Sequence, residues 1–389
     1  MKEPFSARHL LLPLVPLYQL ALALRELRLL LGLEPVRRLR FPVVSVGNLS
    51  TGGSGKTPLT ITLARALAER GLRVDVLSRG YGRRSQLAAC VKPDGIAADF
   101  GDEPLLIARE TGLPVFVASQ RYKAGQLAEA QQSSASEGSG LVGQSFNPET
   151  KPAESTNNPE KAGEDQSVSG HDFSRAKNAA KSAGALAPER YIHLLDDGFQ
   201  HRQLAREVNI LLLNRHDWHD WLLPAGNLRE LRSTVRRASV IAIPAGEPEL
   251  EPELRAGGWQ GPLWRLHRIM ELPAVSGPVA AFCGIARPEQ FFAGLEAAGA
   301  TLAARFAFPD HFVFTRAVLE ELLAEAREKG ASAIVTTKKD LVRVGSLASI
   351  FPKSLPLTTA QLRIEIEDQD TAIDWLMDRV APAPPQPSL

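Results

Sequence analysis

A glycine-rich octapeptide, STGGSGKT, at residues 50–57 sets the strongest limit on how this chain can fold. A short apolar run, Phe41–Gly47, precedes it and is typical of a buried parallel strand. A helical stretch, Lys56–Arg70, follows it and ends before Gly71. A strand, a glycine turn and a helix in this order form the context in which a P-loop binds phosphate. The pattern therefore predicts an α/β protein with a phosphate site at this turn.

Each residue type in the octapeptide has a physical use. Glycines allow backbone N–H groups to converge on phosphate oxygens, and the N-terminus of a helix favours negative charge. Lys56 can reach the outer phosphates, and the Thr57 hydroxyl can ligate Mg²⁺. The usual pattern begins with glycine where this chain has Ser50, so Gly52 and Gly53 would supply the flexibility. The residues expected to bind nucleotide are Ser50, Thr51, Gly52, Gly53, Ser54, Gly55, Lys56 and Thr57.

Further strands and helices alternate along the chain, which predicts a P-loop NTPase-like parallel sheet with helices on both faces. The expected strands of a first domain are Leu72–Ser78, Pro114–Ala118, Tyr191–Asp196, Val208–Leu213 and Ser239–Pro244, with helices at Asp102–Glu110 and Arg121–Ala130. A second alternation comprises strands Pro278–Gly284, Thr301–Phe308 and Ala333–Thr337 and helices Pro288–Ala298, Thr315–Lys329 and Asp370–Val380. We expect an N-terminal helix within 1–40, a nucleotide-binding domain over 41–262, a smaller C-terminal α/β domain over 263–380 and a flexible tail over 381–389, with Pro262–Leu272 linking the two domains.

Residues 131–188 differ in composition from the rest of the chain. The runs QQSSASEGSG, NPETKPAEST and NNPEKAGEDQ contain almost no large apolar residues. Such a segment cannot bury enough surface to offset its ordering entropy. We predict that it is a disordered insertion between a helix and the next strand.

Composition excludes several classes of protein. The 389 residues carry a formal net charge of +1, so no global basic field indicates a nucleic-acid partner. The two cysteines, Cys90 and Cys283, are far apart and outside any CxxC pattern, which argues against a disulfide framework or a zinc site. A content of 44% apolar residues is sufficient for real cores.

The N-terminal run HLLLPLVPLYQLALALRELRLLLGL, residues 9–33, is dense in leucine. Prolines and charged residues interrupt it, so it falls short of the ~20 clean apolar residues of a transmembrane helix. Basic residues flank the run on both sides, which suits an amphipathic helix lying in a membrane interface. A first helix that packs into the core of a soluble protein explains the same pattern equally well.

Acidic and histidine residues supply further candidates for the site. Asp196 and Asp197 end an expected strand, at the sheet edge where a carboxylate meets Mg²⁺. Asp102 opens an expected helix and is either an N-cap or a general base, and the residues alone favour the cap. His311 lies beside an aspartate in a loop of the second domain, in a pair that is also common in surface turns.

Polar and basic residues near these motifs complete a candidate site for an anion. Each arginine taken alone is more often a solvated side chain than a ligand. The candidates for contacts to substrate or phosphate are Arg79, Arg121, Gln200, His201 and Arg229.

Taken together, the motifs VGNLSTGGSGKTP, SRGYGRRS, GDEP, DDGFQH, LLPAGNLRE, FCGIARP and FPDH resemble those of the tetraacyldisaccharide 4′-kinases, which phosphorylate the lipid A precursor. They occur in the family's order from about Val46 to Asp340, apart from the insertion, and that family also has serine at the first P-loop position. The resemblance implies an ATP- and Mg²⁺-dependent transfer of the γ-phosphoryl group to the 4′-hydroxyl of a tetraacyldisaccharide 1-phosphate. It also implies two α/β domains joined by a β linker.

The resemblance further implies roles for individual residues and a location. Asp102 becomes the expected catalytic base with His311 as its partner, and Lys56 and Thr57 bind phosphate and Mg²⁺. Asp196 and Asp197 serve the metal. The N-terminal segment is then expected to attach the protein peripherally to the cytoplasmic face of the inner membrane, where it meets the lipid A disaccharide precursor. A monomer is expected.

Two other hypotheses remain open at this point. The run Thr337-Lys338-Lys339-Asp340 matches the T-K-x-D guanine reader of a GTPase, with residues 214–217 as a weaker match. The run falls in the second domain, away from the predicted P-loop sheet, which makes coincidence the better explanation. The other hypothesis is a membrane-surface module with a vestigial nucleotide site, although such a module need not retain Lys56, Thr57 and Asp196 together.

Overall fold

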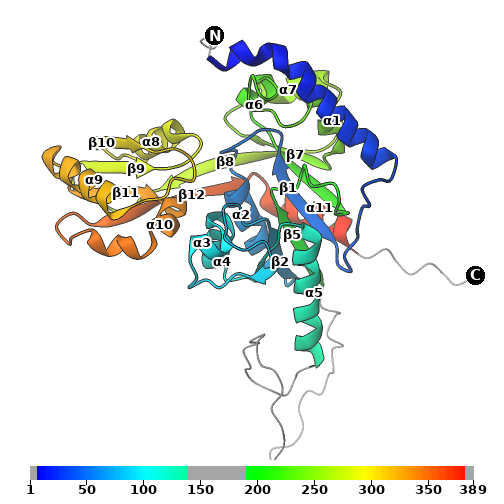
Figure 1. The fold of residues 1–389 in the computed structure, drawn as a ribbon, viewed down its shortest axis with the longest axis horizontal. Helices are drawn as coiled ribbons and strands as arrows, with labels where there is room; N and C mark the ends of the chain where they lie inside the picture. Colours follow the sequence, from blue (N-terminus) through cyan, green and yellow to red (C-terminus); the bar gives the residue numbers. More distant parts are fainter. Residues whose placement is uncertain (1–6, 138–189, 382–389) are drawn as a thin grey trace, which may run out of the picture.

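The computed structural model describes residues 7–137 and 190–381. The strands are β1 (Val43–Asn48), β2 (Arg73–Ser78), β3 (Ala89–Cys90), β4 (Val115–Val117), β5 (Tyr191–Asp196), β6 (Val208–Leu212), β7 (Val240–Pro244), β8 (Leu263–Glu271), β9 (Val279–Cys283), β10 (Leu302–Ala307), β11 (Ala333–Thr337) and β12 (Leu357–Ile366). Within the described residues they form one twelve-stranded sheet in the order β10-β9-β11-β12-β8-β7-β6-β1-β5-β2-β4-β3. Figure 1 shows an N-terminal lobe (β1–β7) and a C-terminal lobe (β9–β11) joined by the long strands β8 and β12. The α/β class and the mostly parallel sheet are confirmed.

The central strands of the N-terminal lobe are buried on both faces, as expected for parallel strands covered by helices. β1 pairs in parallel with β5 and β6, and Val44 lies opposite Leu194. Val44 and Val46 pack into the core on one face of the sheet, whereas Val43 packs into the core on the other. β1 is thereby fixed at the centre of the lobe and leads directly into residues 50–57.

Helices cover both faces of this lobe. They are α2 (Lys56–Glu69), α3 (Ala97–Phe100), α4 (Asp102–Thr111), α5 (Arg121–Glu137), α6 (Arg215–His219) and α7 (Leu250–Ala256), with the 3-10 turn η2 (Arg232–Arg237). α2 and α4 pack on one face, and α5 and α7 pack on the other. α2 begins at Lys56 as predicted and places Leu59, Leu63 and Leu67 in the core at helical spacing.

A buried ion cluster ties α5 to the sheet. His193 of β5 is fully buried, and its Nδ1 lies 2.6 Å from Asp75 Oδ1 while its Nε2 lies 3.4 Å from Glu129 Oε1. Burial acts to lower the pKa of His193, but the hydrogen bonds to Asp75 and Glu129 raise it to about 9. Glu129 Oε1 also accepts the backbone N–H of Arg40 at 2.6 Å. The cluster therefore fixes the chain just before β1.

The C-terminal lobe has its own two-sided core. Its helices are α8 (Pro288–Ala297), α9 (Arg316–Glu328) and α10 (Lys338–Val344), with the 3-10 turn η3 (Gly345–Ile350). Phe282 of β9 packs on the face covered by α9, and Val279 and Cys283 pack on the face covered by α8. The predicted strands of this lobe and its helices α8 and α9 match the structure to within one residue at each end.

The two lobes are connected through β-structure. β8 occupies the predicted linker, pairs in parallel with β7, and pairs antiparallel with β12. We did not predict β12, whose alternating burial is blurred because it lies between the lobes. After β12, helix α11 (Gln369–Val380) packs Ile373 and Leu376 into the same core as α2. The boundary at residue 263 stays a prediction, since the chain returns to the first core after it.

The N-terminal segment forms the 3-10 turn η1 (Ala7–Leu14) and helix α1 (Val15–Leu30) on the outside of the N-terminal lobe (Figure 1). Val15 is buried in the lobe's core, and Leu12, Tyr18 and Leu22 pack against it. The opposite side of the segment is exposed and carries Leu10, Leu11, Leu14, Leu17, Leu20, Leu24, Leu27, Leu30, Leu31, Leu33 and Val36. By length and composition, Arg8–Leu30 could also cross a membrane. One side of the helix therefore packs on the protein, and the other is an unpartnered apolar face.

Of the predicted insertion over 131–188, the structure describes residues 131–137. α5 runs on to Glu137, beyond the end at Ala130 that its composition predicted. The remainder of the insertion, and the tail over 382–389, lie outside the described residues.

Candidate active site

Residues 50–57 form a tight turn between β1 and α2. Gly52 has a φ of 82° and Gly55 a φ of 91°, a left-handed region that favours glycine. The segment 226–229 holds the turn from outside, because Asn227 O accepts the backbone N–H of Thr51 at 2.8 Å. The backbone N–H of Arg229 donates in turn to Leu49 O at 2.7 Å. The LLPAGNLRE motif thus braces the glycine turn.

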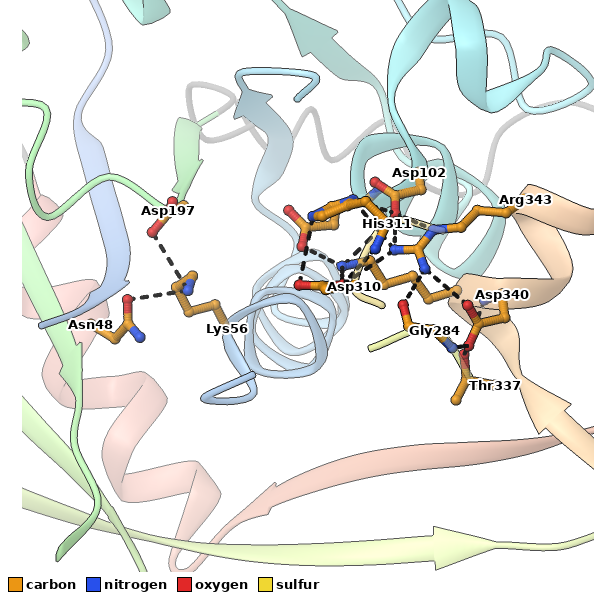
Figure 2. Close-up of polar contacts among 12 residues, drawn as sticks. Asn48, Lys56, Asp102, Asp197, Gly284, Asp310, His311, Thr337, Asp340 and Arg343 are labelled. Atoms are coloured by element: carbon orange, nitrogen blue, oxygen red, sulfur yellow. Dashed lines mark hydrogen bonds and ion pairs between the residues drawn. The ribbon is translucent and has the colours of Figure 1, made fainter. Parts of the chain in front are cut away.

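Asn48, the last residue of β1, organises the polar groups beside the turn (Figure 2). Its Oδ1 accepts from Lys56 Nζ at 3.1 Å and from Arg229 Nη2 at 2.7 Å. Its Nδ2 donates to Ser50 Oγ at 3.1 Å. Ser50 is fully buried, so the residue that departs from the usual P-loop pattern orients Asn48 instead of facing a ligand.

The two aspartates at the end of β5 differ in their partners. Asp197 Oδ1 lies 3.6 Å from Lys56 Nζ and 3.0 Å from Arg229 Nη2. Burial acts to raise the pKa of Asp197, but the charges of Lys56 and Arg229 hold it well below its usual range. Asp196 is 2% exposed and accepts a hydrogen bond from Thr60 Oγ1 at 3.3 Å. Burial, together with the charges of Glu103 and Asp197, raises the pKa of Asp196 to about 7.

These residues fit a bound phosphate and a hard cation. The hydroxyl of Ser54, within the glycine turn, is buried without a hydrogen-bond partner among the described residues, and so is Arg229 Nε. Buried polar atoms of this kind normally have partners, so both fit an oxygen-rich ligand. The described residues contain no group of three His, Cys, Asp or Glu side chains arranged around a metal. The set fits Mg²⁺, which protein sites hold through one or two side chains and substrate phosphates.

Asp102 and His311 come together from different lobes, as Figure 2 shows. Asp102 is the first residue of α4, and the N-cap of that helix is Gly101, so the expectation of an Asp102 cap is wrong. His311 Nδ1 lies 3.2 Å from Asp102 Oδ2. His311 has a φ of 60°, a conformation that non-glycine residues rarely adopt and that is enriched at functional sites.

Asp102 also has cationic neighbours that the sequence did not indicate. Arg343 Nε donates to Asp102 Oδ2 at 2.7 Å, and Arg343 Nη2 donates to the same oxygen. Lys339 Nζ lies 3.8 Å from it. Burial acts to raise the pKa of Asp102, but the hydrogen bond from His311 and the charges of Lys339 and Arg343 hold it well below its usual range. Asp102 is therefore a carboxylate at neutral pH.

The FCGIARP loop of the C-terminal lobe closes on the glycine turn. A Cβ added to Gly52 would lie 2.7 Å from Ala286 Cβ, and one added to Gly53 would lie 3.3 Å from Arg287 Cγ. Arg287 Nη2 then reaches across to Asp217 Oδ1 at 2.5 Å. Asp217 is fully buried, so this ion pair fixes the loop over the turn.

One cavity of about 770 Å³ runs between the lobes and brings most of the predicted site residues together. Those that line it are Thr51, Gly52, Gly53, Ser54, Gly55, Lys56, Thr57, Arg79, Arg121, Asp196, Asp197, Arg229 and His311. Ser50, Asp102, Gln200 and His201 are not in the lining. His311 is therefore the member of the Asp102–His311 pair that faces the cavity.

The remaining basic and polar candidates lie near Asn48 and Arg121. Arg121 is 7% exposed, and burial is the main reason why its pKa is lowered to about 10. The charges of Asp197 and Asp196 act to raise this pKa, whereas the charge of Arg79 acts to lower it. Gln200 Nε2 donates to Asn48 O at 2.7 Å. Burial and the charge of Arg121 lower the pKa of His201 to about 4, so its imidazole is neutral at pH 7.

The T-K-x-D run has a structural use at the contact between the lobes. Thr337 caps α10 and accepts the backbone N–H of Asp340 at 2.9 Å. Lys338 Nζ lies 2.6 Å from Glu110 Oε1, and Lys339 Nζ lies 2.9 Å from Glu103 Oε1. These contacts join α10 to α4 across the two lobes, so nothing in the run supports a guanine reader.

Sequence reasoning missed Asn48, Asn227 and Arg343. Asn48 could have been found, because it is the last residue of the strand that opens the P-loop. Asn227 lies inside a motif that was noted only for Arg229. Arg343 gave no signal, since its partner Asp102 is 241 positions away in the sequence.

A glycine turn at a helix N-terminus, a lysine beside it and carboxylates at the neighbouring strand end define an α/β protein of the phosphoryl-transfer class. Comparison with known proteins is more specific. The sequence profile of the family described as tetraacyldisaccharide-1-P 4′-kinase matches residues 7–138 and 161–381. The tetraacyldisaccharide 4′-kinase of Koribacter versatilis is 34% identical over 376 residues, which cover 94% of this chain and 97% of the relative. That of Geobacter metallireducens is 32% identical over 386 residues, covering 92% and 95%.

A solved structure agrees with these matches. LpxK from Aquifex aeolicus, crystallised in complex with ATP, is 28% identical to this chain with a TM-score of 0.64. The match covers 96% of this chain and all of the other. The chain therefore belongs to the tetraacyldisaccharide 4′-kinase family, and the resemblance seen in its motifs is confirmed. It is a kinase of lipid A biosynthesis, a phosphotransferase with an alcohol acceptor.

Proposed function

We propose that the cavity between the lobes binds Mg-ATP at residues 50–57 and presents its γ-phosphoryl group to the 4′-hydroxyl of a tetraacyldisaccharide 1-phosphate. The observation that carries this proposal is that one cavity is lined both by the glycine turn with Lys56 and by His311, the partner of Asp102. A phosphate donor and a hydroxyl acceptor can then meet in one space. Such transfer depends mainly on positioning and on neutralising charge.

The polar groups around the glycine turn suggest a division of labour. Asp197 is already held by Lys56 and Arg229, whereas the side chain of Asp196 accepts a hydrogen bond from the Thr60 hydroxyl and has no cation paired with it among the described residues. Asp196 and the Thr57 hydroxyl would therefore hold Mg²⁺, and Asp197 would keep Lys56 in place beside the phosphates. Bound Mg²⁺ would supply positive charge to the phosphate oxygens. Lys56 and Arg229 add cationic groups on the same side, and Arg121 and Arg79 line the cavity as further anion contacts.

The Asp102–His311 pair would receive the proton of the acceptor hydroxyl. Asp102 is the base implied by the family resemblance, and His311 lies between it and the cavity. Arg343 and Lys339 keep Asp102 ionised and fix its orientation. Gln200 and His201 do not line the cavity, and Gln200 would steady Asn48 without contacting substrate directly.

We propose further that the protein attaches to the cytoplasmic face of the inner membrane as a peripheral monomer. The exposed leucines of α1 face away from the lobe on which the helix packs. Contacts along the length of the segment hold it against the protein: Arg8 Nη1 donates to Asn227 Oδ1 at 2.8 Å, Tyr18 Oη to Arg229 O at 3.0 Å, and Arg25 Nη1 to Glu230 Oε1 at 3.2 Å. A helix fixed in this way supports a position in the membrane interface and not across the bilayer.

Incubation of the purified protein with γ-labelled ATP and the disaccharide lipid tests the proposal. We expect label to move to the lipid only with Mg²⁺ present, and competition by unlabelled ATP but not by GTP. Lys56→Ala is the matched inactive control. Label transfer that is independent of Mg²⁺, or that GTP suppresses as well as ATP, would contradict the proposed donor.

A further inference from the structure

A second cavity, of about 320 Å³, lies beneath the C-terminal end of α1 and shares no lining residue with the cavity between the lobes. Leu29, Leu30 and Val36 form the side contributed by α1 and the turn after it. The segment 199–206, which follows β5, and Arg237 at the end of η2 form the rest, together with Asn209. We call it the arginine pocket.

The arginine pocket carries excess positive charge. Four arginines lie in or beside it: Arg25, Arg202, Arg206 and Arg237. Two carboxylates are paired with them, since Glu26 contacts Arg202 and Glu230 contacts both Arg25 and Arg237. Four cations against two anions leave a net charge of +2, and burial together with the charges of its neighbours lowers the pKa of Arg206 to about 10. The excess positive charge of the pocket therefore suits the binding of a further anion.

Arg237, which lines the pocket, also has an unpaired hydrogen-bond donor. Nε of Arg237 is buried and has no hydrogen-bond partner among the residues that the structure describes. Nη2 of Arg237 is also buried and lies 3.4 Å from Glu230 Oε2, as an ion pair without a hydrogen bond. Buried donors of a charged group are costly to leave unsatisfied. A guanidinium offers a planar fork of donors that matches the oxygens of a phosphate group. A phosphate ester satisfies both the excess positive charge and the unpaired Nε of Arg237.

The rim of the pocket indicates what the phosphate is attached to. Leu30 and Val36 line the pocket and are 75% and 58% exposed, so they continue the unpartnered apolar face of α1. A soluble anion gains nothing from apolar side chains at the entrance. A lipid gains from both parts of this arrangement, because its phosphate reaches the arginines while its hydrocarbon stays with the leucines.

We propose that the arginine pocket binds the phosphate group of an anionic phospholipid when α1 lies on the membrane. The proposal rests on the membrane attachment suggested above, but it adds a defined lipid site to a general apolar surface. It also predicts that the protein distinguishes anionic from neutral bilayers.

Flotation of the full-length protein with vesicles tests this distinction. Vesicles of phosphatidylcholine alone are compared with vesicles of phosphatidylcholine and phosphatidylglycerol. Arg237→Gln removes one cation, and Val36→Glu places a carboxylate at the exposed rim without touching a buried contact. We expect each to weaken binding to the anionic vesicles about fivefold, the effect of one cation near an anionic surface, and to leave binding to the neutral vesicles unchanged.

Two matched variants serve as controls. Val36→Gln has the size of the glutamate without its charge. Leu33→Glu adds the same charge three positions away, at a side chain that is 65% exposed and outside the pocket lining. Both controls should keep the preference for anionic vesicles. Equal binding of wild type, Arg237→Gln and Val36→Glu to anionic vesicles would overturn the proposal, and so would a Leu33→Glu loss as large as that of Val36→Glu.

A kinase assay in neutral detergent micelles separates the two sources of a lipid phosphate. With the disaccharide lipid as the only phosphate-bearing lipid, an unchanged KM for Val36→Glu supports the phospholipid. A raised KM with normal vesicle preference would assign the pocket to the substrate's own 1-phosphate and overturn the phospholipid. If the wild type shows no kinase activity at all, the proposed function fails, while the vesicle comparison still decides the lipid site.

Discussion

Replacing Gly52 by alanine tests the contact between the glycine turn and the C-terminal lobe. Gly52 has a φ of 82°, and a Cβ there would lie 2.7 Å from Ala286 Cβ. The left-handed backbone costs a non-glycine residue about 1–2 kcal/mol. Overlap between two side chains in a packed contact costs about 1–3 kcal/mol more. Because the overlap exists only when the FCGIARP loop contacts the glycine turn, it destabilises the state in which the two lobes are in contact.

The two costs can be separated by matched variants. Gly299→Ala serves as the backbone control, because Gly299 has a φ of 91° and a Cβ there would meet nothing within 4 Å. Ala286→Gly removes the methyl group that opposes the new side chain. The double variant Gly52→Ala/Ala286→Gly therefore keeps the backbone cost and loses the overlap.

The readout is kcat/KM for ATP, with the melting temperature measured for every variant. Gly52→Ala should lower kcat/KM by about 5- to 150-fold, which corresponds to the overlap cost of about 1–3 kcal/mol, whereas the backbone cost is present in both states and should lower the melting temperature. Adding Ala286→Gly should recover about 5- to 150-fold of that loss, and Gly299→Ala should leave kcat/KM unchanged. If the double variant is no more active than Gly52→Ala, the FCGIARP loop does not sit on the glycine turn in the catalytic state.

Three further predictions concern single side chains. Lys56→Ala should abolish detectable phosphoryl transfer and weaken Mg-ATP binding in calorimetry, whereas normal ATP affinity would refute its phosphate contact. Asp102→Asn should lower kcat by about 10²–10⁴-fold with little change in KM for ATP, and unchanged turnover would remove it from the mechanism. His193→Leu should cost about 3–5 kcal/mol in denaturant unfolding, because Asp75 and Glu129 are left without their cation. The folded pKa of His193, about 9, lies above its unfolded value of about 6.5. This stabilisation is therefore complete below about pH 6.5 and is lost as pH rises through about 9. If the unfolding free energies of wild type and variant change in parallel between these pH values, the assignment is wrong.

Most strands and helices of the fold could be predicted from local sequence patterns. The β1–turn–α2 unit was predictable because each of its features, the apolar strand, the glycines and the helix start, lies within one short stretch of sequence. Strand β12 was not, because its residues serve both lobes and neither a clean alternation nor a turn signal marks it. Helix α11 was found as a helix, but its packing against α2 depends on a return of the chain that periodicity does not encode.

The candidate site divides in the same way. Lys56 and Thr57 follow from a motif whose geometry is local. The pairing of Asp102 with His311 and Arg343 joins two lobes, and no spacing rule predicts it from the residues alone. The family resemblance supplied the Asp102–His311 pair, whereas the cationic environment that sets the state of Asp102 became visible only in the structure.

That environment bears on how much Asp102 can contribute as a base. A general base works best when its pKa lies near the working pH. Arg343 and Lys339 hold the pKa of Asp102 well below its usual range. The carboxylate is therefore ionised at neutral pH, but it is a weak base. We therefore expect the loss in Asp102→Asn to fall near the lower end of the range given above, about 10²-fold. The larger share of the acceleration then belongs to positioning and charge at the glycine turn, where Lys56 and Arg229 lie.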